Sequence, residues 1–378
     1  MFTFMRTAQT RKHHPDYQPG RGAASSETPT RFGMAHREID GDWRDYMERL
    51  DGPPVRLRTT VTEEHPKTIL SFNQSPDIPF DRSINAYRGC EHGCVYCFAR
   101  PTHAFHDLSP GLDFETQLFA KPNAAERLRE TLSKPKYTPG AIALGTNTDP
   151  YQPIERDYRI TRDILKVCLE ARHPVTITTK SDRVLRDMDL LEEMAQEKLV
   201  AVAISVTTLD PVLSSKLEPR CPTPAKRLAA LAKLVECRVP AHCSISPVIP
   251  AITDEFMEAI IERIADIGVK STGWIPLRLP HEVAPLFREW LDVHYPDRAG
   301  KVMGIVRSIR AKDGKGRDND PDFFSRMKPK GVWADLLRSR FRIACKRAGI
   351  GQGSDRHRFE LDCSRFRPPE VGGQMRLF

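Results

Sequence analysis

Between residues 83 and 295, short β-branched runs alternate with amphipathic segments of helical length. The expected strands are residues 83–88, 141–145, 175–179, 200–206, 242–248 and 272–276. The expected helices are residues 160–172, 184–198, 223–237, 254–267 and 285–294. This alternation predicts an α/β fold in which parallel strands are joined by crossover helices. About six units fit, so we expect a partial (β/α)6 TIM-type barrel rather than a closed eight-unit barrel.

Three cysteines, Cys90, Cys94 and Cys97, follow the first expected strand in the sequence CEHGCVYC. Chemistry in barrels of this kind lies at the carboxyl ends of the strands, and the cysteine loop falls at such an end. Three thiolates from one loop fit a [4Fe–4S] cluster, which takes four ligands. One iron would then stay open to a small molecule.

A structural zinc site of the Cys3His type is the alternative for this loop. Its fourth ligand would be His92, His103 or His106. Zinc sites usually pair two knuckles, and the sequence has no second CxxC to complete one. We therefore favour the cluster, and expect His92 to face solvent or to hydrogen-bond near the cluster.

The residues around the cysteine loop resemble the radical S-adenosylmethionine (SAM) superfamily, which also has an aromatic residue, here Tyr96, before the third cysteine. The runs YRGC, CFARPTHAFH, GLDFE, TDPYQPIE and LRLP are similar to the branch that contains spore photoproduct lyase and its uncharacterised bacterial relatives. The resemblance covers about residues 65–378. It implies that Cys90, Cys94 and Cys97 hold a [4Fe–4S] cluster and that the open iron binds SAM. It also implies reductive cleavage of SAM to a 5′-deoxyadenosyl radical, with electrons from a low-potential donor of the flavodoxin or ferredoxin type.

The same resemblance, together with the strand ends, indicates which residues contact SAM. Tyr96 fits the position near the adenine. The candidates at the ends of the second, third and fourth strands are Thr146, Asn147, Thr148, Asp149, Lys180 and Ser205. Residues 146–149 differ from the Gly-Gly-Glu sequence that is commoner at this place in the superfamily. Alternatively, these polar residues form an Asx-type turn before Pro150 and do not contact SAM. We expect Arg227 to form an ordinary surface ion pair.

Six cysteines lie outside the loop: Cys168, Cys221, Cys237, Cys243, Cys345 and Cys363. Cys168, Cys237 and Cys345 fall on apolar helical faces and are expected in the core, whereas Cys221 and Cys363 lie in polar, irregular segments. Spore photoproduct lyase uses a further cysteine, shortly after the cluster loop, to return a hydrogen atom to its product. This chain has no cysteine between Cys97 and Cys168, which argues against thymine-dimer repair unless Cys221 or Cys363 substitutes.

Charge divides the chain into three expected parts: a weakly ordered leader at 1–64, the barrel at 65–298 and a basic helical extension at 299–378. The extension holds 19 Lys and Arg against 9 Asp and Glu, an excess of +10 in a chain whose net charge is +8. Such asymmetry is typical of contact with DNA or another polyanion, although a merely solvated basic surface gives the same pattern.

The last residues, Gln374, Met375, Leu377 and Phe378, resemble the short peptide by which bacterial replication and repair proteins dock on the sliding clamp. A tail packed on its own core is the alternative. The sequence has no apolar stretch of roughly 18 residues that would cross a membrane, and no export signal. With nine cysteines, an odd number, we expect a cytoplasmic protein with reduced thiols and no membrane partner.

These features favour a radical SAM enzyme acting on DNA or a nucleotide, in a lyase or repair type of reaction. One alternative is the same chemistry on a protein, RNA or small molecule. The other is a non-catalytic iron–sulfur or zinc protein.

Overall fold

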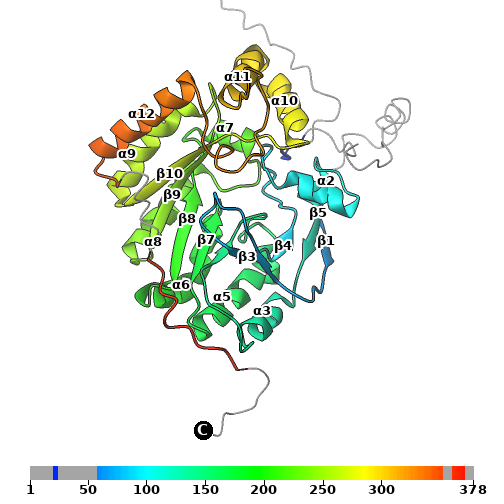
Figure 1. Cartoon of the computed structure of the whole chain (residues 1–378), viewed down its shortest axis with the longest axis vertical. Helices are drawn as coiled ribbons and strands as arrows, with labels where there is room; N and C mark the ends of the chain where they lie inside the picture. The colour runs from blue at the N-terminus through cyan, green and yellow to red at the C-terminus, as the bar shows by residue number, and fades with distance from the viewer. Residues whose placement is uncertain (1–19, 24–57, 352–359, 371–378) are drawn as a thin grey trace, which may run out of the picture.

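The computed structural model describes residues 20–23, 58–351 and 360–370. Its larger sheet contains β2 (Leu70–Phe72), β3 (Arg82–Ile84), β6 (Ile142–Leu144), β7 (Val175–Thr179), β8 (Val200–Ser205), β9 (Ala241–Val248) and β10 (Ser271–Pro276). The strand order is β10-β9-β8-β7-β6-β3-β2 (Figure 1). All neighbours pair in parallel except β2, which runs antiparallel to β3. The predicted α/β fold with parallel strands is confirmed.

A second, three-stranded sheet supports the cysteine loop. It consists of β1 (Thr60–Glu63), β5 (Gln117–Ala120) and β4 (Tyr87–Arg88), in the order β1-β5-β4. β4 leads directly into the loop. Between the loop and β5 lie η1 (Arg100–His106), a 3-10 helix, and the short α2 (Asp113–Thr116). The chain therefore enters and leaves the cysteine loop through paired strands.

The crossover helices are α3 (Ala124–Leu132), α5 (Ile160–Glu170), α6 (Met188–Gln196), α8 (Pro224–Glu236) and α9 (Met257–Ile267). Two of the expected helices begin instead as 3-10 turns, η2 (Asp182–Asp187) and η3 (Asp254–Phe256). In η2 the Ser181 hydroxyl accepts the backbone N–H of Arg183, which tightens the first turn. Two further short helices, α4 (Glu155–Tyr158) and α7 (Pro211–Leu217), follow β6 and β8.

The main core lies between the sheet and these helices. Val200, Val202 and Ile204 of β8 are buried in it together with Leu231 and Leu234 of α8. Burying a side chain of this size contributes about 2 kcal/mol, so these residues hold β8 firmly in the core. A second apolar cluster lies at the strand ends and includes residues of the cysteine loop.

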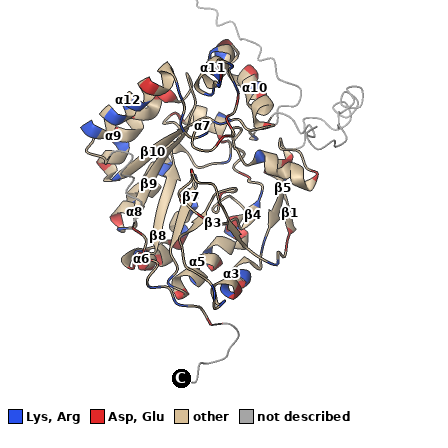
Figure 2. Cartoon of the chain, viewed as in Figure 1, with Lys and Arg blue, Asp and Glu red and all other residues tan. Residues whose placement is uncertain are grey.

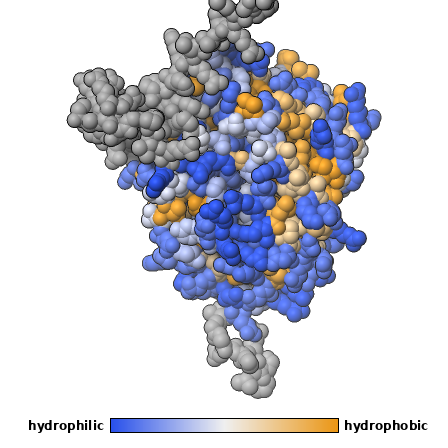
Figure 3. Space-filling model, turned by 180° about the vertical axis from the view of Figure 1, so that it is seen from behind, coloured by the Kyte–Doolittle hydropathy of each residue, from blue (hydrophilic) through white to orange (hydrophobic). Residues whose placement is uncertain are grey.

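After the last strand come α10 (Val283–His294) and α11 (Pro296–Ile309), and the expected boundary at residue 298/299 falls within α11. The extension continues with α12 (Val332–Arg347), which packs on α9. Lys and Arg side chains are frequent on α12 (Figure 2). Residues 360–370 then cross the amino ends of the strands, where the Arg367 N–H donates to the Ala171 carbonyl at 2.9 Å. Seen from behind, apolar patches lie among hydrophilic residues (Figure 3). Of the helices described, none is long and apolar enough to cross a membrane.

Candidate active site

The cysteine loop is a series of tight turns at the end of β4. The Gly93 N–H donates to the Cys90 carbonyl at 3.3 Å, and the Cys97 N–H donates to the Cys94 carbonyl at 3.2 Å. Cys90 and Cys94 are buried and Cys97 is half-buried. The three thiols thus come from one short, folded stretch at a strand end, where the sequence predicted them.

A buried arginine, Arg100, holds the cysteine loop in its folded path. The Arg100 guanidinium forms an ion pair with the Glu115 carboxylate at 2.5 Å, and neither side chain is exposed to solvent. Its nitrogens also donate to four backbone carbonyls, those of Gly93, Cys94, Pro110 and Gly111. Because a guanidinium presents five donors in a rigid fork, Arg100 fixes the path of the cysteine loop.

A short stretch of the predicted leader, Gly20–Ala23, also belongs to this site. The backbone N–H groups of Gly22 and Ala23 donate to the two Glu115 carboxylate oxygens at 3.0 and 2.9 Å. A Cβ placed on Gly22 would lie 1.7 Å from the Gly93 carbonyl oxygen, so only glycine fits this contact with the cysteine loop. Residues 24–57 fall outside the described part of the chain.

The polar residues that follow β6 form hydrogen bonds with the backbone of the cysteine loop. The Thr148 hydroxyl and the Gln152 amide both donate to the Gly89 carbonyl, at 2.7 and 3.2 Å. The Gln152 side-chain oxygen accepts the Glu91 N–H at 2.9 Å. Thr148, a predicted SAM contact, therefore holds the protein backbone here.

Asp149, another predicted SAM contact, also bonds to groups of the protein itself. Its carboxylate accepts the Thr179 hydroxyl at 2.6 Å and the Lys180 N–H at 2.8 Å, and it lies 3.3 Å from His92 Nδ1. Burial opposes the charge, but the neighbouring His92 and these hydrogen bonds hold the pKa of Asp149 at about 2. Asp149 thus joins the ends of β6 and β7 to the cysteine loop.

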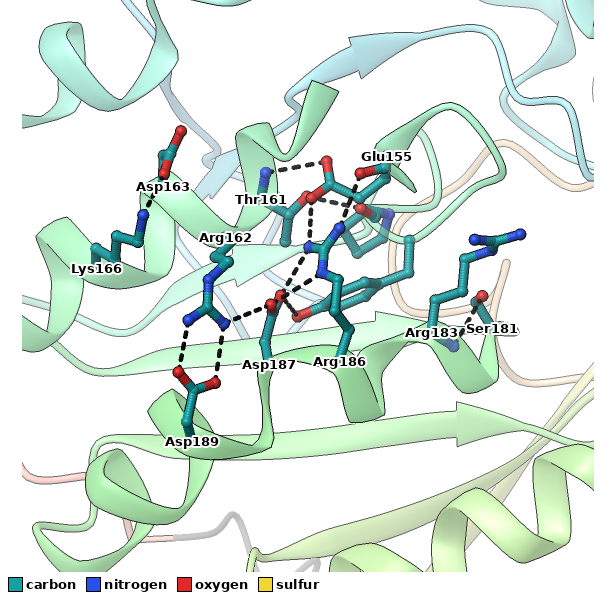
Figure 4. A network of polar contacts seen from close by, with 12 residues as sticks. Glu155, Thr161, Arg162, Asp163, Lys166, Ser181, Arg183, Arg186, Asp187 and Asp189 are labelled. Carbon is teal, nitrogen blue, oxygen red and sulfur yellow. Dashed lines mark hydrogen bonds and ion pairs between the residues drawn. The ribbon is translucent and has the colours of Figure 1, made fainter. Parts of the chain in front are cut away.

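A network of polar contacts anchors the chain that follows Asp149 (Figure 4). The Glu155 carboxylate accepts the Arg186 guanidinium at 2.7 Å and also the Tyr87 hydroxyl from β4. Asp187 accepts the Tyr151 hydroxyl at 3.0 Å. The network links the strand that precedes the cysteine loop to the loops after β6 and β7.

Of the two alternatives for His92, exposure to solvent is wrong, because its ring is buried against Asp149. Its hydrogen bonding to Asp149 and Cys90, beside the cysteine loop, agrees with the other alternative. Burial lowers the pKa of His92, but the Asp149 carboxylate and the Cys90 thiol outweigh it and raise the pKa to about 10. His103 is engaged elsewhere, with Nε2 2.8 Å from the Gln117 carbonyl, and His106 packs on the Phe119 ring. His103 and His106 are therefore not placed beside the three cysteines as a fourth zinc ligand.

Tyr96 points to a second buried ion pair. Its hydroxyl donates to the Glu218 carboxylate, which pairs with the Arg227 guanidinium, and both charged side chains are almost fully buried. The prediction of a surface ion pair for Arg227 is therefore wrong. Arg227 Nη1 also donates to the Ser205 carbonyl at 3.2 Å. The Arg227–Glu218 pair therefore joins Ser205, at the end of β8, to Tyr96 of the cysteine loop.

Lys180 completes this side of the site. Its ammonium lies 5.7 Å from the centre of the Tyr96 ring. Burial disfavours its charge, but nearby Cys94 and Glu218 raise the pKa of Lys180 above its usual value. The side chain thus remains a cation next to the cysteine loop.

The loop thiols differ in their ease of ionisation. Contact with Cys221 and the nearby Lys180 lower the pKa of Cys94 to about 7, whereas burial raises that of Cys97 to about 12. Because thiolates are the ligands of iron–sulfur clusters, the donor set fits a [4Fe–4S] cluster, and its binding would release protons.

The structure separates the two cysteines left open by the sequence. Cys221 Sγ lies 3.9 Å from Cys94 Sγ, at the site. Cys363 lies beside Ala141, at the amino end of β6 and thus at the opposite end of the barrel. Cys168 and Cys345 are buried in the core as predicted, and Cys237 is half-buried.

Asn147 is exposed at the rim, and its N–H donates to the Asn85 side-chain oxygen at 2.9 Å, while Thr146 contacts the same asparagine.

A cavity of roughly 220 Å³ opens beside the cysteine loop. Its lining includes His92, Ser181, Arg183, Arg220, Cys221 and Lys226. Sequence reasoning missed Arg100, Glu115 and the cationic lining, because their roles depend on contacts between distant segments.

Comparison with known proteins agrees with this geometry. Residues 84–264 match the family model described as the Radical SAM superfamily. An uncharacterized protein of Mycobacterium tuberculosis is 37% identical over 242 residues, which cover 63% of this chain and 71% of that protein. An uncharacterized protein of Methanocaldococcus jannaschii is 34% identical over 241 residues, covering 61% and 86%.

Among solved structures, a spore photoproduct lyase mutant with dinucleoside spore photoproduct has a TM-score of 0.54 at 14% identity, covering 84% of this chain and 86% of that one. Another mutant of the lyase, with bound AdoMet and the dinucleoside, has a TM-score of 0.52 at 13% identity, covering 76% and 78%. At these identities the likeness concerns the fold.

Proposed function

Because this chain belongs to the radical SAM superfamily, we propose that it is an enzyme that cleaves SAM reductively and acts on DNA or a nucleotide. The observation that carries the proposal is the presentation of Cys90, Cys94 and Cys97 by one turn-rich loop at the strand ends. When bound there, a [4Fe–4S] cluster would supply the electron that converts SAM to methionine and a 5′-deoxyadenosyl radical. A flavodoxin or ferredoxin type of protein is the proposed electron donor.

The protein's own part is to hold and orient these groups. Arg100 and Glu115 fix the cysteine loop, and Asp149 and Thr148 brace it. Lys180 offers a cation to the SAM carboxylate, and Tyr96, held by Glu218, offers a ring to the adenine. Thr146, Asn147 and Ser205 remain candidate contacts at the rim.

Two observations support a polyanionic substrate. The cavity beside the loop is lined by the cations Arg183, Arg220 and Lys226, and the extension carries the positive excess of the chain. The lyase that shares this fold has been captured with a dinucleoside, which makes nucleic acid the first substrate class to assay. Electrostatic binding to DNA would weaken steeply with added salt.

Docking on a sliding clamp through Gln374, Met375, Leu377 and Phe378 remains a proposal, since these residues lie outside the described ranges. Deletion of residues 374–378 should abolish capture by the clamp. Unchanged capture by the shortened chain would refute it.

The central test is anaerobic reconstitution with iron and sulfide, followed by measurement of iron per chain and of 5′-deoxyadenosine released from SAM. Cys90→Ala, Cys94→Ala and Cys97→Ala should lose iron and release, whereas Cys237→Ala, a cysteine away from the site, should keep both. Retention of iron and release by the loop variants would refute the proposal. Stimulation of release by intact or irradiated DNA, compared with RNA, protein and no substrate, then tests the substrate class.

A further inference from the structure

A long connection between α11 and α12, residues 311–330, spans the open side of the barrel; we name it the bridging loop (Figure 1). One of its anchors lies at the end of β10. The Arg310 guanidinium donates to the Leu277 carbonyl at 3.0 Å and also to the Arg326 carbonyl. Arg278 reaches the Met327 sulfur at 3.7 Å. The loop is thereby tied to one edge of the seven-stranded sheet.

Its other anchor lies at the opposite edge. Arg326 forms a bidentate ion pair, at 2.6 and 2.7 Å, with Asp77 of the β2–β3 connection. The Phe324 N–H donates to the same carboxylate at 3.3 Å. Since β10 and β2 are the outer strands of the sheet, the bridging loop crosses the gap between them.

This crossing is connected to the candidate active site. The segment that carries Leu277 and Leu279 belongs to the same apolar cluster as Cys94 and Tyr96. The β10 anchor of the bridging loop therefore adjoins a segment that packs with the cysteine loop.

Between its two anchors the bridging loop exposes two neighbouring aromatic rings. Phe323 is 53% exposed and Phe324 is 57% exposed. The Arg326 guanidinium lies 4.8 Å from the centre of the Phe323 ring and holds it in place. Adjacent exposed rings on an anchored loop provide flat apolar surfaces on which a base can stack.

The charges around these rings favour an anion. Two of the loop's four carboxylates are in ion pairs, Asp318 with Arg288 and Arg307, and Asp322 with Lys312. The other two, Asp313 and Asp320, form no ion pair with the described residues. Four of the loop's cations likewise form no ion pair within the described ranges. These are Lys315, Arg317, Lys328 and Lys330.

We propose that the bridging loop binds the unpaired bases of a nucleic acid, with Phe323 and Phe324 stacking on the bases and the four unpaired cations contacting the phosphates. The combination of exposed aromatic rings and cations is typical of single-strand binding surfaces. The inference rests on the proposed function, because it takes the substrate of that site to be a nucleic acid. DNA and RNA share the chemistry, so both belong in the test.

The test measures binding of the reconstituted full chain to fluorescein-labelled dT20, rU20 and a duplex of equal length by anisotropy. The double variant Phe323→Ala/Phe324→Ala should weaken single-strand binding by at least about 5-fold, since each stacked base contributes that much or more. Leu336→Ala, which removes a 56% exposed apolar side chain from α12, should leave binding unchanged. Lys328→Gln/Lys330→Gln should reduce the salt dependence of binding by about one to two released counterions.

Unchanged affinity in both double variants would overturn the inference. Equal weakening by Leu336→Ala would do the same, because it would assign binding to the apolar surface in general. The reconstituted variants should still release 5′-deoxyadenosine from SAM without substrate, so a failure of the bridging loop is distinguishable from a failure of radical chemistry. If the wild-type chain binds nucleic acid but the loop variants bind as well as it does, the proposed function survives and the inference does not.

Discussion

Removal of the Arg100 guanidinium is the sharpest perturbation of the site. In Arg100→Met, the Glu115 carboxylate would remain buried without its guanidinium partner, while keeping the Gly22 and Ala23 N–H groups as hydrogen-bond donors. Breaking one side of a buried ion pair costs about 3–5 kcal/mol. Four backbone carbonyls also lose the guanidinium as a donor, although that of Cys94 keeps the Cys97 N–H. We therefore expect a loss near the middle of this range.

The assay is urea unfolding of the reduced, iron-free chain under anaerobic conditions, together with iron per chain after reconstitution. A loss of about 4 kcal/mol from a typical total of 5–15 kcal/mol is readily measured. The matched control is Arg129→Met, which breaks the exposed ion pair with Glu170 and should cost about 0–1 kcal/mol. If both variants lose the same free energy and Arg100→Met still takes up full iron, the buried pair does not hold the loop.

Three further predictions address other parts of the site and fold. Gly22→Ala should expose the chain near Gly93 to faster hydrogen exchange and lower iron uptake, whereas Gly300→Ala, where a Cβ meets no atom within 4 Å, should not. Lys180→Met should weaken SAM binding about 10-fold in equilibrium dialysis, as expected for a lost charge-assisted contact, and unchanged affinity would assign the carboxylate to another group. Burial lowers the pKa of His173 from 6.5 to about 4, so its stabilising contribution is complete above pH 6.5 and is lost as the pH falls toward 4. The unfolding free energy should drop by up to about 3 kcal/mol over this window, and His173→Gln should flatten that part of the profile.

Most of the barrel could be predicted because its signals are local. β7 has the predicted bounds, and β8, β9 and β10 differ by one residue at one end. Each of these strands is a short β-branched or apolar run between helical segments, so period and length suffice. The starts of η2 and η3 were missed because a 3-10 turn and an α-helical turn have nearly the same pattern of apolar positions.

The contacts of the site could be predicted only in part. Strand-end logic placed Thr148 and Asp149 at the ends of the strands as SAM contacts, but it could not show that the protein itself uses them to brace the cysteine loop. Arg227 and Glu218 lie in a proline-dense segment that carries no sign of burial, yet they form a buried ion pair. A charged residue in a sequence gives no measure of its depth, because depth depends on segments that meet only in the fold.

The buried charges around the cysteine loop are not balanced evenly. Arg100 with Glu115, and Arg227 with Glu218, are internally neutral pairs that fix geometry on two sides of the loop. Lys180 belongs to neither pair and faces Cys94. Since ligand thiols must lose their protons to bind iron, a cation beside them lowers the cost of forming the thiolates. The same cation would attract a carboxylate, so we propose that the one charge of Lys180 serves both the formation of the cluster and the placement of SAM.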